Sequence, residues 1–104
     1  MENNNPFLKV SDIKDLIRHL SDELNKRDDA EVVEFEVDLY WNIMDEELYN
    51  PYDEPGGFTM GSLTEDWEFL QKVVMGERQM IDYDLYKLAS ILKFLGKRNI
   101  IQKE

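Results

Sequence analysis

Residues 33–42 alternate between apolar side chains and side chains that are acidic or polar. The apolar positions are Val33, Phe35, Val37, Leu39 and Trp41, and the positions between and after them are Glu34, Glu36, Asp38, Tyr40 and Asn42. A period of two residues predicts a β-strand with one buried face and one acidic face in water. Because a lone strand leaves its backbone N–H and C=O groups unpaired, this strand needs a partner.

The sequence offers two partners for this strand. Residues 57–61 are the only other extended candidate, and they are short and interrupted by glycine. Either this segment pairs back on the strand, or the strand over residues 31–43 pairs with its own copy in a second chain. The segment between them, residues 44–57, is expected to be a loop because it contains Asn50-Pro51 and Pro55-Gly56-Gly57.

Apolar side chains with helical spacing predict a helix over residues 12–26. They occupy one face at positions i, i+3, i+4, i+7 and i+11, namely Ile13, Leu16, Ile17, Leu20 and Leu24. We expect the hydroxyl of Ser11 to cap this helix by accepting from amides of its first turn.

A second helix is predicted directly after residue 62. Ser62 and Glu65 have the spacing of a capping box, and Gly76 is expected to end the helix. Its apolar face would be Leu63, Trp67, Leu70 and Val74.

A third helix is predicted over residues 82–96, with Asp82 as its cap and Gly96 at its end. Its expected inner face is Leu85, Leu88, Ala89, Leu92 and Leu95. The opposite side repeats Tyr86, Ser90 and Phe94. A helix that is apolar on two sides is typical either of central burial or of a contact with another chain.

These elements predict an α+β fold: a small helix-dominated domain in the order α-β-(loop, short β)-α-α. Its sheet is small and is completed either within the chain or by a homodimer through strand 31–43 and helix 82–96. We expect residues 1–10 to be a frayed N-terminus, residues 11–98 a single α+β domain and residues 99–104 a C-terminal tail. The N-terminus has no basic region followed by a long apolar one, so no signal peptide and a cytoplasmic location are expected.

Negative charge is concentrated in the middle of the chain. The formal net charge is −11, and residues 31–68 carry 12 acidic and no basic side chains. The preceding segment carries 7 acidic and 5 basic side chains, and the following one 4 and 7. Because phosphates and anionic lipids repel such a chain, we expect it to bind neither nucleic acid nor a membrane.

The acidic segment also holds seven of the twelve aromatic residues, which leads to our main functional hypothesis. We expect a non-enzymatic interaction module that binds a basic protein, as an immunity protein or inhibitor does, because tyrosine dominates interface hot spots and carboxylates steer a cationic partner. The candidate contacts are Tyr40, Tyr49, Tyr52, Asp53, Glu54, Glu34, Glu36 and Asp38. Trp41 and Trp67 are expected in the core. Two alternatives stay open: a self-associating structural or assembly protein, and an acidic surface that only keeps the chain in solution.

Catalytic chemistry has little support in the sequence. There is no cysteine, and His19 is the single histidine, expected at the rim of its helix or in water. We therefore expect no metal site and no cofactor. A remote alternative is a small hydrolase using Glu34, Glu36 and Asp38, whose carboxylates would project from one strand face. General acid catalysis needs a raised pKa and therefore burial, whereas this face is expected in water.

Four stretches of the chain carry a resemblance to known proteins. They are the run Val37-Asp38-Leu39-Tyr40-Trp41-Asn42-Ile43, the loop residues 47–55 (ELYNPYDEP), the run of residues 59–67 (TMGSLTEDW) and the helix over residues 88–95. Over residues 33–96 the chain resembles small acidic bacterial proteins of an uncharacterised family, with an aromatic strand, a Tyr-Pro-Glu-Pro-like loop and two C-terminal helices. The resemblance implies that strand, loop and second helix form one structural unit. It implies no activity and no site residues.

Overall fold

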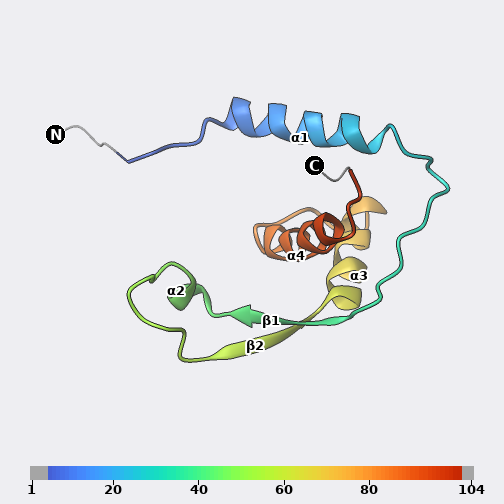
Figure 1. The fold of residues 1–104 in the computed structure, drawn as a ribbon. Helices are drawn as coiled ribbons and strands as arrows, with labels where there is room; N and C mark the ends of the chain where they lie inside the picture. The colour runs from blue at the N-terminus through green and yellow to red at the C-terminus, as the bar shows by residue number, and fades with distance from the viewer. Residues whose placement is uncertain (1–4, 102–104) are drawn as a thin grey trace. The chain divides into compact units, whose positions relative to one another are not determined.

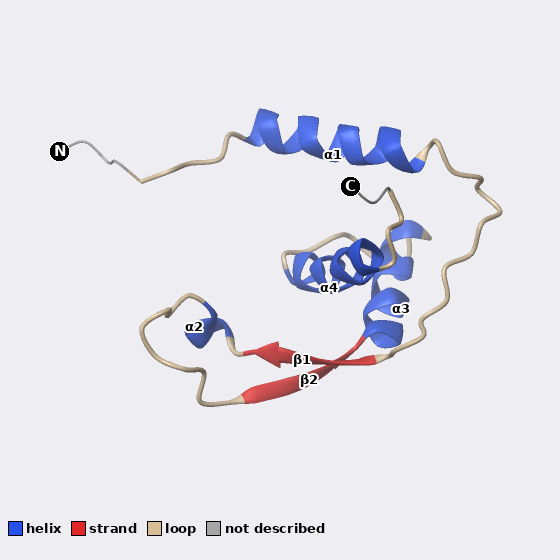
Figure 2. Ribbon diagram, in the orientation of Figure 1, coloured by secondary structure: helices blue, strands red, loops and turns tan. Residues whose placement is uncertain are grey.

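The computed structural model describes residues 5–101 of the chain (Figure 1). Its elements are α1 (Val10–Leu24), β1 (Leu39–Ile43), α2 (Asp45–Leu48), β2 (Phe58–Ser62), α3 (Leu63–Val74) and α4 (Tyr83–Lys97). Helices outweigh the single small sheet, which confirms the predicted α+β class (Figure 2). The outer parts of the predicted frayed N-terminus and C-terminal tail, residues 1–4 and 102–104, lie outside the described residues.

The chain divides into two units, one of residues 1–33 with 99–104 and one of residues 34–98. The single domain predicted for residues 11–98 stays a prediction. No helix in the described part of the chain is both long and apolar enough to cross a bilayer.

The first unit contains α1, an amphipathic helix as the spacing predicts. The expected cap is wrong, because Ser11 lies inside the helix and Lys9 occupies the N-cap position. The Lys9 carbonyl accepts from the amides of Asp12 and Ile13 at 3.0 and 3.1 Å, so Ser11 lies within the first turn and not before it.

The second unit begins with an antiparallel β1–β2 hairpin, so the partner of the predicted strand lies in the same chain. The pairs are Leu39–Ser62, Tyr40–Gly61, Trp41–Met60, Asn42–Thr59 and Ile43–Phe58. The strand is shorter than the alternation predicts, because β2 has five residues and the chain becomes helical at residue 63. Residues 33–38 therefore have no strand beside them. The homodimer stays a prediction, and the sheet does not need it for its pairing.

The connection between the two strands contains α2, a single helical turn that the sequence analysis places in a loop. Glu47 of this turn closes the connection, since its carboxylate accepts from the amides of Gly56 and Gly57 at 2.9 and 3.3 Å. In the loop itself, the side chain of Asn50 accepts from the amide of Tyr52 at 3.2 Å, which orders the turn that carries this tyrosine.

Helix α3 follows β2 without a linker, and its predicted cap is confirmed. The Ser62 hydroxyl accepts from the amide of Glu65 at 3.2 Å. Asp38 supplies a second cap, because its carboxylate accepts from the amide of Thr64 at 2.8 Å and from the Ser62 hydroxyl at 3.0 Å. Gly76 has a φ of +77° just after the helix, which supports the predicted stop at glycine.

Helix α4 packs against α3, but with a face different from the expected one. Its buried side chains are Asp84, Ile91 and Phe94, whereas Leu85 and Leu92 of the expected inner face are 56% and 39% exposed. Apolar residues surround most of this helix, so their spacing alone does not select the buried side.

Asp82 occupies the N-cap position of α4 as predicted, but its side chain makes no capping bond. The carboxylate of Asp84 instead accepts from the amide of Ile81 at 2.8 Å, and the predicted stop at Gly96 is wrong. The helix continues through Gly96 to Lys97, and Asn99 is the residue with a positive φ, at 55°.

The core of the second unit is small and lies between α3 and α4. Its buried apolar side chains are Leu63, Leu70, Ile91 and Phe94. The ring of Phe35 contacts that of Phe94 at a centroid distance of 5.4 Å, so the segment before β1 packs on α4 although it is not in the sheet. A core of this size leaves much apolar surface uncovered.

Candidate functional site

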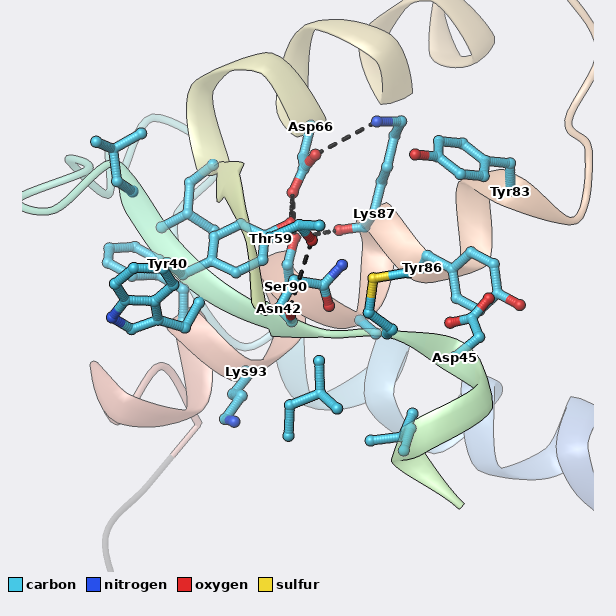
Figure 3. A pocket seen from close by; sticks show the side chains of 18 of the residues that line it. Tyr40, Asn42, Asp45, Thr59, Asp66, Tyr83, Tyr86, Lys87, Ser90 and Lys93 are labelled. Atoms are coloured by element: carbon cyan, nitrogen blue, oxygen red, sulfur yellow. Dashed lines mark hydrogen bonds and ion pairs between the residues drawn. The ribbon is translucent and has the colours of Figure 1, made fainter. Parts of the chain in front are cut away.

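A groove of about 880 Å³ runs along the second unit between β1, α2 and α4 (Figure 3). Its polar lining includes Tyr40, Asn42, Asp45, Asp66, Lys87 and Ser90. These residues come from the hairpin, from α2, from α3 and from α4, so the fold and not local sequence brings them together.

Asp66 is the centre of the polar cluster in this groove, and it is 5% exposed. Its Oδ2 accepts from the hydroxyls of Tyr40 and Ser90, each at 2.6 Å, and its Oδ1 faces the Nζ of Lys87 at 3.4 Å. We call Asp66, Tyr40, Lys87 and Ser90 the Asp66 cluster. A buried carboxylate needs such partners, and here they tie β1 and α4 to α3.

The groups of the Asp66 cluster satisfy one another. Burial raises the pKa of Tyr40 above its ordinary value, and the hydrogen bond to Asp66 acts in the same direction. Lys87 lies over the rings of Phe69 and Tyr83, with Nζ 4.6 and 4.7 Å from their centroids. A tyrosine that holds its proton and a lysine held between two rings are suited to positioning, not to proton transfer.

A second buried carboxylate, Asp84, stabilises the start of α4. It is 1% exposed and faces the guanidinium of Arg78, whose Nη1 donates to Oδ2 at 2.8 Å. The hydrogen bonds from Arg78 hold the pKa of Asp84 at about 2, well below its usual value. Arg78 also donates to the carbonyl of Phe69 at 2.8 Å and so joins the two helices.

Four of the predicted contact residues precede or lie in β1, and two of them have a structural role instead of a free side chain. Tyr40 was expected to face away from the core, which is wrong, because it points to Asp66. Asp38 is exposed but caps α3, and the amide and hydroxyl groups of Thr64 and Ser62 lower its pKa.

The other two predicted strand carboxylates, Glu34 and Glu36, are exposed. Glu36 forms an ion pair with Arg98 just after α4. Because residues 33–38 are not in the sheet, the expected row of carboxylates on one strand face does not form. An exposed carboxylate such as Asp38, with a lowered pKa, is not suited to be a general acid.

The remaining predicted contacts lie together in the connection after α2. Tyr49 and Tyr52 are 86% and 92% exposed, and Asp53 and Glu54 are exposed beside them. We call residues 45–54 the acidic loop; it holds Asp45, Glu46, Glu47, Asp53 and Glu54 and no basic side chain. Asp45 reaches from this loop toward α4, where its charge raises the pKa of Tyr86 (Figure 3).

An apolar surface on the hairpin is not among the predicted sites. Leu39, Trp41, Phe58 and Met60, here called the outer face, are 59%, 70%, 56% and 56% exposed. The expectation that Trp41 lies in the core is therefore wrong, and Trp67 is only partly buried at 40% exposure. The rings of Trp41 and Phe58 meet edge to face at 6.0 Å. The signal for this surface is the alternation of Phe58 and Met60 with Thr59 and Gly61 in the short second strand.

No family model, curated protein or solved structure matches the chain. The resemblance to an uncharacterised acidic bacterial family thus stays a prediction. Within residues 5–101, no group of three acidic or histidine side chains is placed to hold a metal ion.

Proposed function

We propose that the protein is a non-enzymatic interaction module that binds a basic protein through its acidic loop. The observation that carries the proposal is the exposure of Tyr49 and Tyr52, at 86% and 92%, beside Asp53 and Glu54. Large tyrosine rings in water lose little conformational entropy on binding and provide much contact area.

The charge around these tyrosines favours a basic partner. The 12 acidic and no basic side chains of residues 31–68 produce a one-sign field that accelerates the approach of a cationic protein. An inhibitor or immunity protein that neutralises a cationic nuclease or toxin is the most concrete form of this function. Such a protein needs a rigid charged surface and no catalytic group.

The test is capture of partners on the immobilised full chain from a lysate of the source organism. We expect a retained protein of positive net charge, lost when Tyr49 and Tyr52 become alanine together with Asp53→Asn and Glu54→Gln. The matched control replaces Phe7→Ala, Leu8→Ala, Asp29→Asn and Glu77→Gln, which are also exposed but lie outside the acidic loop. Equal retention by the loop variant and the unchanged chain would contradict the proposal.

A self-associating assembly module is the second candidate. It is supported by exposed apolar side chains on α4, where Leu85 and Tyr86 are 56% and 59% exposed. Sedimentation at high micromolar concentration tests it. A monomer at both low and high salt would remove this candidate, because high salt screens the repulsion between two acidic chains.

A further inference from the structure

The outer face of the hairpin is a continuous apolar surface. Its four side chains belong to adjacent strands, and Trp41 stands directly opposite Met60 in the register. The face has a hollow of about 220 Å³, which is lined by Leu39, Tyr40, Trp41 and Met60. That volume is large enough for one aliphatic side chain, so the surface has a small pocket beside the exposed indole of Trp41.

The dimensions of this face fit one helix. Two strands about 4.8 Å apart, with their side chains, form a surface roughly 10 Å wide, and five residues at about 3.3 Å each make it roughly 16 Å long. An α-helix is about 10 Å across and rises about 1.5 Å per residue, so about ten helical residues cover the face. An amphipathic helix on an apolar surface is a common mode of protein recognition.

The charges beyond both ends of the hairpin select among possible helices. Asp38 precedes β1, the carboxylates of α2 follow it, and Glu65 and Glu68 lie in the helix that follows β2. A helix with lysine or arginine on its polar side matches these carboxylates. A second copy of the chain would instead bring another segment with 12 acidic and no basic side chains against the first.

We propose that the outer face receives an amphipathic, cationic helix of the basic partner, with one aliphatic side chain in the hollow beside Trp41. This inference rests on the proposed function and names the part of the partner that the hairpin binds. The acidic loop attracts the partner, and the outer face holds its apolar side.

The test uses the full chain with Trp67→Phe, so that Trp41 is the single tryptophan, and a synthetic helical peptide of leucine and lysine with one apolar side. Two comparison peptides have the same number of leucines. In one, the leucines and lysines are in scrambled order, and in the other, glutamates replace the lysines. We expect the amphipathic cationic peptide to shift Trp41 emission to the blue and to protect it from acrylamide. The scrambled and acidic peptides should bind at least about tenfold more weakly, a difference of about 1.4 kcal/mol.

Two sets of variants locate the binding. Phe58→Ser with Met60→Ser should weaken the peptide about tenfold or more, as expected for hot-spot contacts. Leu85→Ser, an equally exposed leucine on α4, should leave the affinity unchanged. Circular dichroism and urea unfolding of the same variants identify any loss that comes from unfolding, and Phe58→Leu then repeats the test with the fold intact.

Three results would overturn the inference: equal binding of the cationic and acidic peptides, no effect of the Phe58 and Met60 changes, or Trp41 already protected in the free chain. The last result would mean that a second copy or the chain itself covers the face, and sedimentation distinguishes the two. Failure of the proposed function looks different. In that case the loop variant and the unchanged chain retain the lysate partner equally, whether or not the peptide binds the outer face.

Discussion

The two faces of the β1–β2 hairpin belong to the same ten residues but have opposite surroundings. On the inner face, the hydroxyl of Tyr40 is tied to the buried carboxylate of Asp66. On the outer face, Trp41 is the neighbour of Tyr40 in the chain and is 70% exposed. The more polar of two adjacent aromatic residues is thus the more buried one. Hydrogen-bond partners on α3 and α4, and not hydrophobicity, decide which face is covered.

This difference separates the residues that hold the fold from those that are available for binding. Tyr40 and Asp66 connect three elements, so changes there should affect stability. Trp41 and Phe58 are mostly exposed and meet edge to face, so changes there should affect binding and leave the fold in place. The predictions below test that separation, from the largest expected effect to the smallest.

Asp66→Ala should have the largest effect. It leaves the hydroxyl of Tyr40 without its acceptor, leaves Ser90 only the carbonyl of Lys87 to donate to, and removes the counter-ion of the mostly buried ammonium of Lys87. Breaking a buried ion pair on one side costs roughly 3–5 kcal/mol of unfolding free energy. Urea unfolding measures it, with Glu68→Ala on the exposed side of the same helix as control. A loss below about 1 kcal/mol would mean that the Asp66 cluster does not hold the hairpin.

Gly61→Ala should have the next largest effect on the free energy of unfolding. A Cβ at position 61 would overlap Cζ of Tyr40, so the ring must move and its hydrogen bond to Asp66 must lengthen. Overpacking of this kind costs roughly 1–3 kcal/mol. A double-mutant cycle with Tyr40→Leu checks the cause. If the two losses simply add, the contact between ring and glycine is not the reason.

Asp84→Asn should matter only where Asp84 is ionised. The folded-state pKa of about 2 lies below the ordinary value of 3.8, so the stabilising contribution is fully present above about pH 4 and is lost as the pH falls toward 2. We expect the urea midpoints of the unchanged chain and of the variant to differ at pH 6 and to approach each other at pH 2. Parallel midpoints across this range would contradict the assignment.

Trp41→Thr should have the smallest effect on stability, about 0.5 kcal/mol or less, because the indole is mostly in water and threonine keeps the preference for a strand. The same change should weaken binding of the cationic helix about tenfold. Urea unfolding and the fluorescence of a labelled peptide measure the two effects. A large loss of stability would place Trp41 among the residues that hold the fold and remove the separation between the faces.

The sequence predicts α1, α3 and α4 from local spacing and turn chemistry, and it offers β2 as one of two possible partners for β1. The Ser62 cap and the glycine stop at Gly76 follow from chemistry within one turn of chain. The buried faces of β1 and α4 do not follow from local spacing. Each of these elements carries apolar or aromatic residues on two sides, so more than one rotation satisfies the pattern.

The acceptor that selects the face of β1 lies far away in sequence. Asp66 is 26 residues from Tyr40 and 24 from Ser90, and no periodicity within β1 indicates that Asp66 will be the acceptor. The length of β1 is likewise set elsewhere, by the point where β2 becomes helical. The exposure of Tyr49, Tyr52, Asp53 and Glu54 follows from their place in a loop, while their role in binding stays a prediction.

The close approach of Tyr40 to Gly61 also has an evolutionary consequence. A side chain at position 61 and a large ring at position 40 exclude each other, so the two positions should change together among related chains. Acidic residues at position 66 and hydroxyls at positions 40 and 90 should be gained or lost as one set. Tyrosine, glycine, aspartate and serine at these separations therefore form a signature by which distant relatives can be recognised, even where the acidic loop and the outer face have diverged to suit another partner.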